Sequence, residues 1–513
     1  MKKTNIRHII LVTSSLLLAG ACSKSWLEPL PKGQIPEEKY YKTAAEAEAA
    51  LTAVYDVVGW QGNGYVTKVG TVDAASDDHL AGGGGPNDVT DYQVISNYTL
   101  TPATGPQAEL WKKGFAGIFR ANTLLAKIEG ISMDAGVKAR YIAEAKALRA
   151  YFYFDLVRFF RNVPLMTAPV VAIDDMFNVA QAKPEEVYAQ IEKDLKDALA
   201  ETNLPDKVAL ATEAGRLSKG AVHALLGRVY VWEQKWPAAI TELAEVNGAT
   251  VGGSKYGYKL VDNFGDLFKS DMAHKFNSES VFEISYNSSS NGGWDCVNCT
   301  EGNVLNIMTG PRGYKILKPE QAPDYVSGWS FLVITKSLFD AIHGDPRYKY
   351  TVANLDSLEK NGIVTYEKGF NNTGYFMEKF AGRVANRSTG GTPELNYPQN
   401  IYEIRLADTY LLEAEALVRN GESGLAGTRS FTLFNAVRAR VGLPAIPVTL
   451  DNILSERRLE LAGEGHRWLD LVRFGKAATF LQSKGFIAGK HEVLPIPLLE
   501  LENTKLEQNP EWK

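Results

Sequence analysis

Residues 454–474 constrain the fold more than any other stretch, because they combine a dense charge pattern with an apolar seam. The seam recurs at spacings of three and seven, which place it on one face of a helix. It consists of Leu454, Leu461, Trp468 and Leu471. Gly463 and Gly465 interrupt the pattern, so we expect two helical pieces with a bend between them.

Charged residues fill the rest of this stretch, with a glutamate at every fourth position and arginines in between. They are Glu456, Arg457, Arg458, Glu460, Glu464, His466, Arg467 and Asp470. One interpretation is catalytic, with the carboxylates as acids and His466 as a base. The other is a charge-laced helix pair that ties the C-terminal region together. We favour the second, since acid–base pairs three or four apart are ordinary surface chemistry on a helix.

The order Glu-Arg-Arg-x-Glu-x-x-x-Glu-Gly-His-Arg-Trp-x-Asp-Leu, which begins at Glu456, resembles the C-terminal signature of the RagB/SusD family of Bacteroidetes outer-membrane lipoproteins. Residues 26–31, 149–165, 491–497 and 509–512 resemble the same family. The resemblance implies a nutrient-binding protein, not an enzyme, without a cofactor.

The N-terminus has the pattern of an export signal. Lys2, Lys3 and Arg7 precede an apolar run at residues 9–18, which is too short to span a bilayer. Small residues then lead to Cys22, as in a bacterial lipobox. We predict a lipoprotein signal peptide at residues 1–21, lipidation of Cys22 and a Pro-rich tether at residues 22–37. The chain would then be anchored in the outer membrane by its lipid and exposed at the cell surface.

Charge excludes one class of partner. The 513 residues include 55 basic and 60 acidic ones, for a net charge of −5. Nucleic-acid binding requires a basic stripe, which this balance does not supply, so we expect no nucleic-acid partner.

Helical periodicity covers much of the remaining chain, at residues 38–58, 110–128, 137–160, 184–202, 218–246, 401–419 and 425–441. Residues 226–243 follow tetratricopeptide-repeat spacing, where Gly227 lets two helices approach closely and Ala239 lets them dock. We predict a mainly α fold: a tetratricopeptide-like helical repeat scaffold with long irregular binding loops, which is SusD-like as the resemblance implies. Residues 38–270 form its N-terminal region and residues 271–513 its C-terminal region.

Two long stretches, residues 59–106 and 247–400, lack helical periodicity and are rich in Gly, Asn, Ser and Pro. Long irregular segments in a folded protein are often functional, so we place ligand binding there. Short β-like runs at residues 281–286 and 375–380 are expected to pair locally.

Most motifs of catalysis and metal binding are absent from the sequence. It has no Gly-x-Ser-x-Gly, no His-Glu-x-x-His and no phosphate-binding loop. The loop acids between Asp73 and Asp91 lack EF-hand spacing, and we expect no metal. Cys296 and Cys299 form a disulfide or remain inert thiols, since an exported compartment favours oxidation and further zinc ligands do not cluster nearby.

Glycan binding requires flat aromatic faces for sugar rings and polar groups for their hydroxyls. The aromatic candidates in the irregular stretches are Trp60, Tyr65, Trp294, Tyr314, Tyr325 and Trp329. The polar candidates are Asp77, Asp78, Asn87 and Arg312. From these we select Asp77, Asp78, Asn87, Trp294, Arg312, Tyr325 and Trp329 as predicted ligand-binding residues.

The resemblance implies capture of a glycan or oligosaccharide and its delivery to a SusC-type TonB-dependent outer-membrane transporter. A RagB-type peptide binder is the first alternative. A surface glycosidase is less favoured and would need two carboxyl groups about 5–10 Å apart in a cleft. A purely structural adaptor is the last alternative, since tetratricopeptide repeats usually bind proteins.

Overall fold

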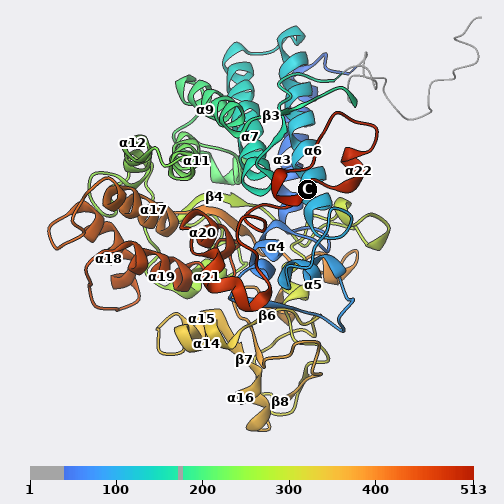
Figure 1. The fold of residues 1–513 in the computed structure, drawn as a ribbon, viewed down its shortest axis with the longest axis vertical. Coiled ribbons are helices and arrows are strands. Elements are labelled where there is room, and N and C mark those ends of the chain that lie inside the picture. Colours follow the sequence, from blue (N-terminus) through green and yellow to red (C-terminus); the bar gives the residue numbers. More distant parts are fainter. Residues whose placement is uncertain (1–39, 171–176) are drawn as a thin grey trace, which may run out of the picture.

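The structure is a computed structural model that describes residues 40–170 and 177–513. The predicted signal peptide, the tether and Cys22 lie outside the described residues. The described chain is mainly helical, with short strands, as predicted (Figure 1). No helix among the described residues is long and apolar enough to cross a membrane.

The scaffold is an array of antiparallel helix pairs. Its members are α3 (Ala44–Gly59), α6 (Gln107–Lys127), α7 (Ala135–Phe160), α9 (Pro184–Ala200), α11 (Lys219–Trp232), α12 (Trp236–Asn247), α17 (Leu406–Arg419) and α18 (Arg429–Arg440). Each helix from α6 to α18 packs on the next member, and α3 packs on α6 and α7 (Figure 1). The C-terminal pair α17–α18 therefore continues the N-terminal array, although about 160 residues separate it from α12 in the chain.

Glycines let these helices approach. A Cβ on Gly227 of α11 would lie 2.6 Å from Cγ of Leu243 on α12, which confirms the predicted close contact. A Cβ on Gly117 of α6 would likewise lie 2.3 Å from the Phe152 ring on α7. Larger residues at these positions would push the pairs apart, because packed interiors have little free space.

The strands form five two-stranded antiparallel sheets within the described residues. They pair β1 (His79–Gly82) with β6 (Phe331–Ile334), β4 (Ser280–Ile284) with β10 (Ile401–Arg405), β7 (Val352–Asn354) with β9 (Tyr375–Met377), β2 (Val163–Pro164) with β3 (Gln181–Ala182), and β5 (Lys315–Ile316) with β8 (Val364–Thr365). The expected local pairing of residues 281–286 is wrong, because β4 pairs with the distant β10. Residues 401–419 are not all helix either, since β10 precedes α17.

Residues 59–106 are more regular than their sequence indicated. They contain α4 (Lys68–Ala75), β1 and α5 (Thr90–Ser96). All eight residues of α4 are buried, including polar ones such as Lys68 and Asp73. A helix that is buried on every side shows no amphipathic stripe, which is why periodicity missed it.

Short helices and 3₁₀ turns connect these elements. Two of the 3₁₀ turns are η2 (Trp60–Gly62) and η5 (Trp294–Cys299). The short α-helices are α10 (Leu210–Glu213), α13 (Leu305–Met308), α14 (Lys336–Ile342), α15 (Tyr348–Thr351), α16 (Leu355–Lys360), α21 (Ala477–Leu481) and α22 (Leu498–Leu501).

The C-terminal stretch forms α19 (Leu450–Glu460) and α20 (Arg467–Arg473), with a bend at Gly463 and Gly465. Both glycines have positive φ, +73° and +76°, so the prediction of two helical pieces is confirmed. The four seam residues, from Leu454 to Leu471, are buried as expected.

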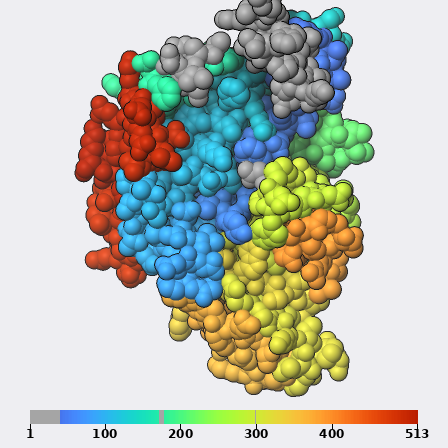
Figure 2. Space-filling view, turned by 90° about the vertical axis from the view of Figure 1, so that its right-hand side faces the viewer, coloured from blue at the N-terminus to red at the C-terminus, as the bar shows by residue number. Residues whose placement is uncertain are grey.

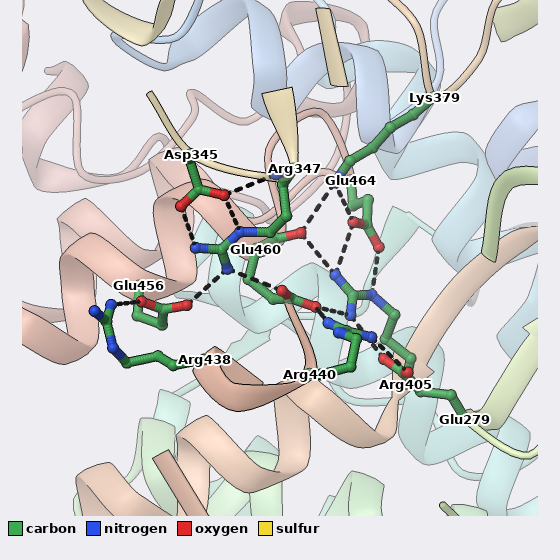
Figure 3. A network of polar contacts seen from close by, with 10 residues as sticks. All are labelled: Glu279, Asp345, Arg347, Lys379, Arg405, Arg438, Arg440, Glu456, Glu460 and Glu464. Atoms are coloured by element: carbon green, nitrogen blue, oxygen red, sulfur yellow. Dashed lines mark hydrogen bonds and ion pairs between the residues drawn. The ribbon is translucent and has the colours of Figure 1, made fainter. Parts of the chain in front are cut away.

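The charges of this stretch do not lie on the surface, which corrects the expectation of ordinary surface pairing. Glu460 is fully buried and contacts Arg347, Arg405 and Arg440 (Figure 3). Burial opposes its ionisation, yet the three surrounding arginines hold the pKa of Glu460 well below its ordinary value. The network ties the C-terminal helices to β10, to α18 and to residues 345–347, so its role is structural, as favoured.

Candidate functional site

Three aromatic rings from distant segments meet on one face of the molecule. Tyr65 follows η2, Trp294 begins η5, and Trp329 precedes β6. The ring centroids lie 5.8 Å apart for Tyr65–Trp294, 6.0 Å for Tyr65–Trp329 and 5.8 Å for Trp294–Trp329. We refer to these three rings as the aromatic platform. The segments that carry it adjoin one another in Figure 2, in blue, yellow-green and yellow.

The platform is open to solvent, and its rings are nearly parallel to one another. Tyr65 and Trp294 are each 46% exposed, and Trp329 is partly buried. The ring planes differ by only 22°, 30° and 33°. Large exposed aromatic side chains are costly to hydrate and are typical of binding sites. Nearly parallel faces of this kind suit the flat apolar faces of sugar rings.

Local contacts fix the backbone that carries two of the rings, Trp329 and Trp294. Trp329 N–H donates to the Ile307 carbonyl at 2.8 Å, and close approach of Gly310 and Gly328 permits this contact. A disulfide between Cys296 and Cys299 closes the turn that begins at Trp294. Fixed rings lose little conformational freedom when a ligand binds.

Polar groups border the platform. Arg312 donates from Nη2 to the Trp329 carbonyl at 2.9 Å and lies 3.5 Å from the Asp88 carboxylate. Its Nε is buried without a hydrogen-bond partner among the described residues. Asp88 in turn accepts a hydrogen bond from Gly84 N–H at 2.7 Å. The Arg312 guanidinium and the Asp88 carboxylate are both partly exposed, so the pair offers donor and acceptor groups beside the rings.

Two of the larger cavities have volumes of about 420 Å³ and 720 Å³, and the second of these opens beside Tyr65. Asp88, Asp91, Glu109 and Lys112 line it. Burial raises the pKa of Asp91, and the nearby Glu109 charge adds to that shift. The pocket can thus supply both hydrogen-bond donors and acceptors to a polyhydroxyl ligand.

Two predicted ligand residues lie elsewhere, in a buried ion cluster. Asp77 accepts two hydrogen bonds from Arg467, and Asp78 pairs with Arg458. Their side chains are only 9% and 1% exposed. Burial opposes ionisation of Asp77, but Arg467 and Arg458 hold its pKa below the ordinary value. Both carboxylates act as partners of the C-terminal arginines and do not reach the platform.

The other predicted residues divide between the site and the interior. Trp294, Trp329 and Arg312 belong to the platform and its border, and Asn87 is exposed next to Asp88. Tyr325 is buried, and its hydroxyl hydrogen-bonds Glu378. Tyr314 packs beside it at 5.5 Å, and Trp60 lies under the Arg120 guanidinium at 4.9 Å.

One residue near the pocket, Lys113, was not among the residues predicted from the sequence. Lys113 lies near the pocket on the buried face of α6, one turn after Leu110 and one turn before Gly117. A lysine on an apolar helix face is unusual unless it is paired, so it marks a structural or functional role.

In the described part of the chain, no group of three or more His, Cys, Asp or Glu residues is arranged to hold a metal ion.

A helical-repeat scaffold that presents exposed aromatic rings with a polar border is typical of glycan-binding proteins. Comparisons with known proteins agree. The model described as "SusD family" matches residues 278–486, and the one described as "Starch-binding associating with outer membrane" matches residues 26–231. The chain belongs to the SusD/RagB family, whose members are carbohydrate-binding proteins associated with the outer membrane.

Individual relatives match over nearly their whole length. A solved "Laminarin binding SusD-like protein" is 48% identical, with a TM-score of 0.87, and the match covers 92% of this chain and 100% of that one. A SusD-like protein of Formosa agariphila is 28% identical, over 99% of both chains. The Bacteroides thetaiotaomicron surface glycan-binding protein A, solved with laminarihexaose, is 24% identical over 91% of this chain and 100% of that one, with a TM-score of 0.79, and supports the fold.

Proposed function

We propose that this protein captures laminarin or its oligosaccharides on the aromatic platform. The observation that carries the proposal is the convergence of Tyr65, Trp294 and Trp329 into one exposed, nearly parallel set of rings. The choice of glycan is supported by the 48% identity to a laminarin-binding relative. Three separate segments each place an exposed aromatic ring at the same position on the surface, and core packing does not explain this arrangement.

In this proposal the rings cover the apolar faces of successive sugars. The partly exposed guanidinium of Arg312 and the Asp88 carboxylate hold hydroxyl groups at the edge of the platform. The adjoining pocket, with Asp91 and Lys112, accepts a neighbouring sugar or a branch. Shallow binding of this kind depends on preformed rings rather than on enclosure.

The wider setting is part of the same proposal. The thiol of Cys22 is lipidated, residues 1–21 are then removed, and residues 22–37 tether the fold to the outer membrane at the cell surface. The captured glycan passes to a SusC-type TonB-dependent transporter. Pull-down with an affinity tag on the full chain from its native membrane, with a Cys22→Ser variant as control, tests anchoring and partnership together.

The binding proposal is tested with the soluble protein, residues 23–513, by affinity electrophoresis and calorimetry. The ligands are laminarin, laminarihexaose, starch, xylan and a mixed peptide digest. Trp294→Ala and Trp329→Ala should each abolish retardation by laminarin. Phe119→Ala is the matched control, because Phe119 is 56% exposed on α6 and contributes nothing to the platform. Its affinity should equal that of the wild type.

Other outcomes would overturn the proposal. Binding of peptides without any glycan would establish a RagB-type peptide binder. Release of reducing sugar, lost on substitution of Asp91 or Glu109, would establish a glycosidase. Laminarin binding that survives all three ring substitutions would move the site away from the platform.

A further inference from the structure

One buried lysine, Lys113, binds the backbone of the loop at residues 60–66, which carries Tyr65. Lys113 of α6 is only 3% exposed. Its Nζ donates to the carbonyl oxygens of Trp60, Asn63 and Val66 at 2.8, 3.0 and 2.8 Å. An ammonium has three donors, so this geometry satisfies all of them with backbone oxygens of a single loop. Residues 60–66 thus fold around the end of one side chain.

The same loop is joined to the segment that carries Trp294. Asn63 Nδ2 donates to the Thr300 carbonyl at 2.7 Å, and Thr300 Oγ1 donates to Asn63 Oδ1 at 3.0 Å. Thr300 directly follows η5, the turn that contains Trp294 and the disulfide. Two platform rings are therefore linked through Asn63, and Lys113 holds the backbone of that residue.

No ion pair of Lys113 is present within the described residues, and the groups that contact its ammonium are three backbone carbonyls. Burial lowers the pKa of Lys113 to about 8, with Glu109 opposing and Lys112 adding to the shift. Asp88, Asp91 and Tyr65 also border the pocket that Lys113 lines. A neutral amine has only two donors and a lone pair, so deprotonation would leave one of the three carbonyls without its bond.

We propose that Lys113 is a positioning residue of the glycan site, whose charged ammonium fixes residues 60–66 and so sets Tyr65 against Trp294 and Trp329. This inference rests on the proposed function. It predicts that glycan affinity depends on Lys113 remaining charged, although Lys113 itself need not touch the ligand.

The experiment measures laminarihexaose affinity by calorimetry between pH 6.5 and 9.5 for wild type, Lys113→Met and Lys113→Arg. At pH 7, Lys113→Met should bind about tenfold more weakly, because three buried carbonyls lose their donor. Wild-type affinity should fall by a similar factor as the pH rises through about 8. Lys113→Met should show no such fall, and Lys113→Arg should retain binding at pH 9.5.

Lys484→Met is the matched control. Lys484 also donates to three backbone carbonyls, those of Ala74, Ser76 and His79, at 2.7, 2.6 and 2.9 Å. It holds a segment that carries no platform ring. Its loss should destabilise the protein yet leave affinity at pH 7 within about twofold of wild type. Hydrogen exchange without ligand should rise at residues 60–66 and 294–301 in Lys113→Met only.

The possible failures are distinct. If wild type binds no glycan at any pH, the proposed function is wrong. If wild type binds and Lys113→Met binds equally well, or if wild-type affinity stays constant up to pH 9.5, the positioning role is wrong. If Lys113→Met does not fold, the comparison of wild type with Lys113→Arg at pH 7 and 9.5 decides, because the guanidinium stays charged at both.

Discussion

Asp77 and Arg467 form a two-pronged ion pair across 390 positions of sequence, with Nε to Oδ1 at 2.7 Å and Nη2 to Oδ2 at 2.9 Å. Arg467 lies in the C-terminal signature, and Asp77 lies two residues before the start of β1. β1 pairs with β6, the strand that follows Trp329. The signature thus fixes the segment that leads into β1, which is a structural role.

Removal of Arg467 should destabilise the fold. Arg467→Met leaves Asp77 buried without its bidentate partner, and breaking a buried pair costs about 3–5 kcal/mol. Chemical denaturation should report the loss. The double variant Asp77→Asn with Arg467→Met should recover part of it, since the uncompensated charge is gone. A double variant no more stable than Arg467→Met alone would mean that the two residues are not coupled.

Arg312 should contribute to glycan affinity through its partly exposed guanidinium. Arg312→Gln should weaken laminarihexaose binding by about 1–2 kcal/mol, since it removes a donor and a contact of the Trp329 carbonyl. Calorimetry at constant pH measures this loss. Arg387→Gln is the control, because Arg387 is a surface arginine 3.5 Å from Glu394 and lies outside the platform. Equal affinity of Arg312→Gln and wild type would remove Arg312 from the site.

The disulfide should mainly restrict the motion of the turn that contains Trp294. Cys296→Ser with Cys299→Ser should lower glycan affinity by about 0.5–1.5 kcal/mol, the usual ordering cost of a freed interface side chain. The loop is short, so unfolding stability should fall by only about 2 kcal/mol. Calorimetry with and without a reductant measures the first effect and thermal unfolding the second. A reductant that changes neither would show that the turn is fixed by its other contacts.

His79 should make stability depend on pH. It is fully buried, neither ring nitrogen has a hydrogen-bond partner among the described residues, and burial lowers its pKa to about 3. Between pH 6.5 and 3, the His79 imidazole is protonated in the unfolded chain but stays neutral in the folded chain. The contribution of His79 to stability is therefore full above pH 6.5 and is lost as the pH falls through that window.

His79→Leu should remove this dependence. Replacing an unsatisfied buried polar group with an apolar one of similar size is neutral or stabilising, so the variant should equal or exceed wild type at pH 7. Its advantage should grow from pH 6.5 to 5 in denaturant titrations. Burial also lowers the pKa values of His466 and His491 to about 4, so both contribute to the slope that remains in the two proteins. A variant whose stability parallels wild type over this range would exclude His79 as the source.

Much of the fold followed from the sequence because it depends on local patterns. The periodicity of α6, α7 and α9 located these helices to within a few residues, and Gly463 and Gly465 marked the bend in the C-terminal stretch. Gly227 signalled a close helix pair. The family signature was also readable from residue order alone. Trp294 and Trp329 could be selected because large rings in irregular segments are rarely all core.

Only the tertiary structure decided which distant groups meet. The acids Asp77 and Asp78 resemble Asp88 in sequence, yet the first two are neutralised by arginines about 390 positions away, and Asp88 remains at the site. Tyr325 and Trp329 are four positions apart, yet one is buried and one borders solvent. Burial and pairing depend on contacts between remote segments, which helical or strand periodicity does not encode, whereas local backbone preference is encoded in each stretch.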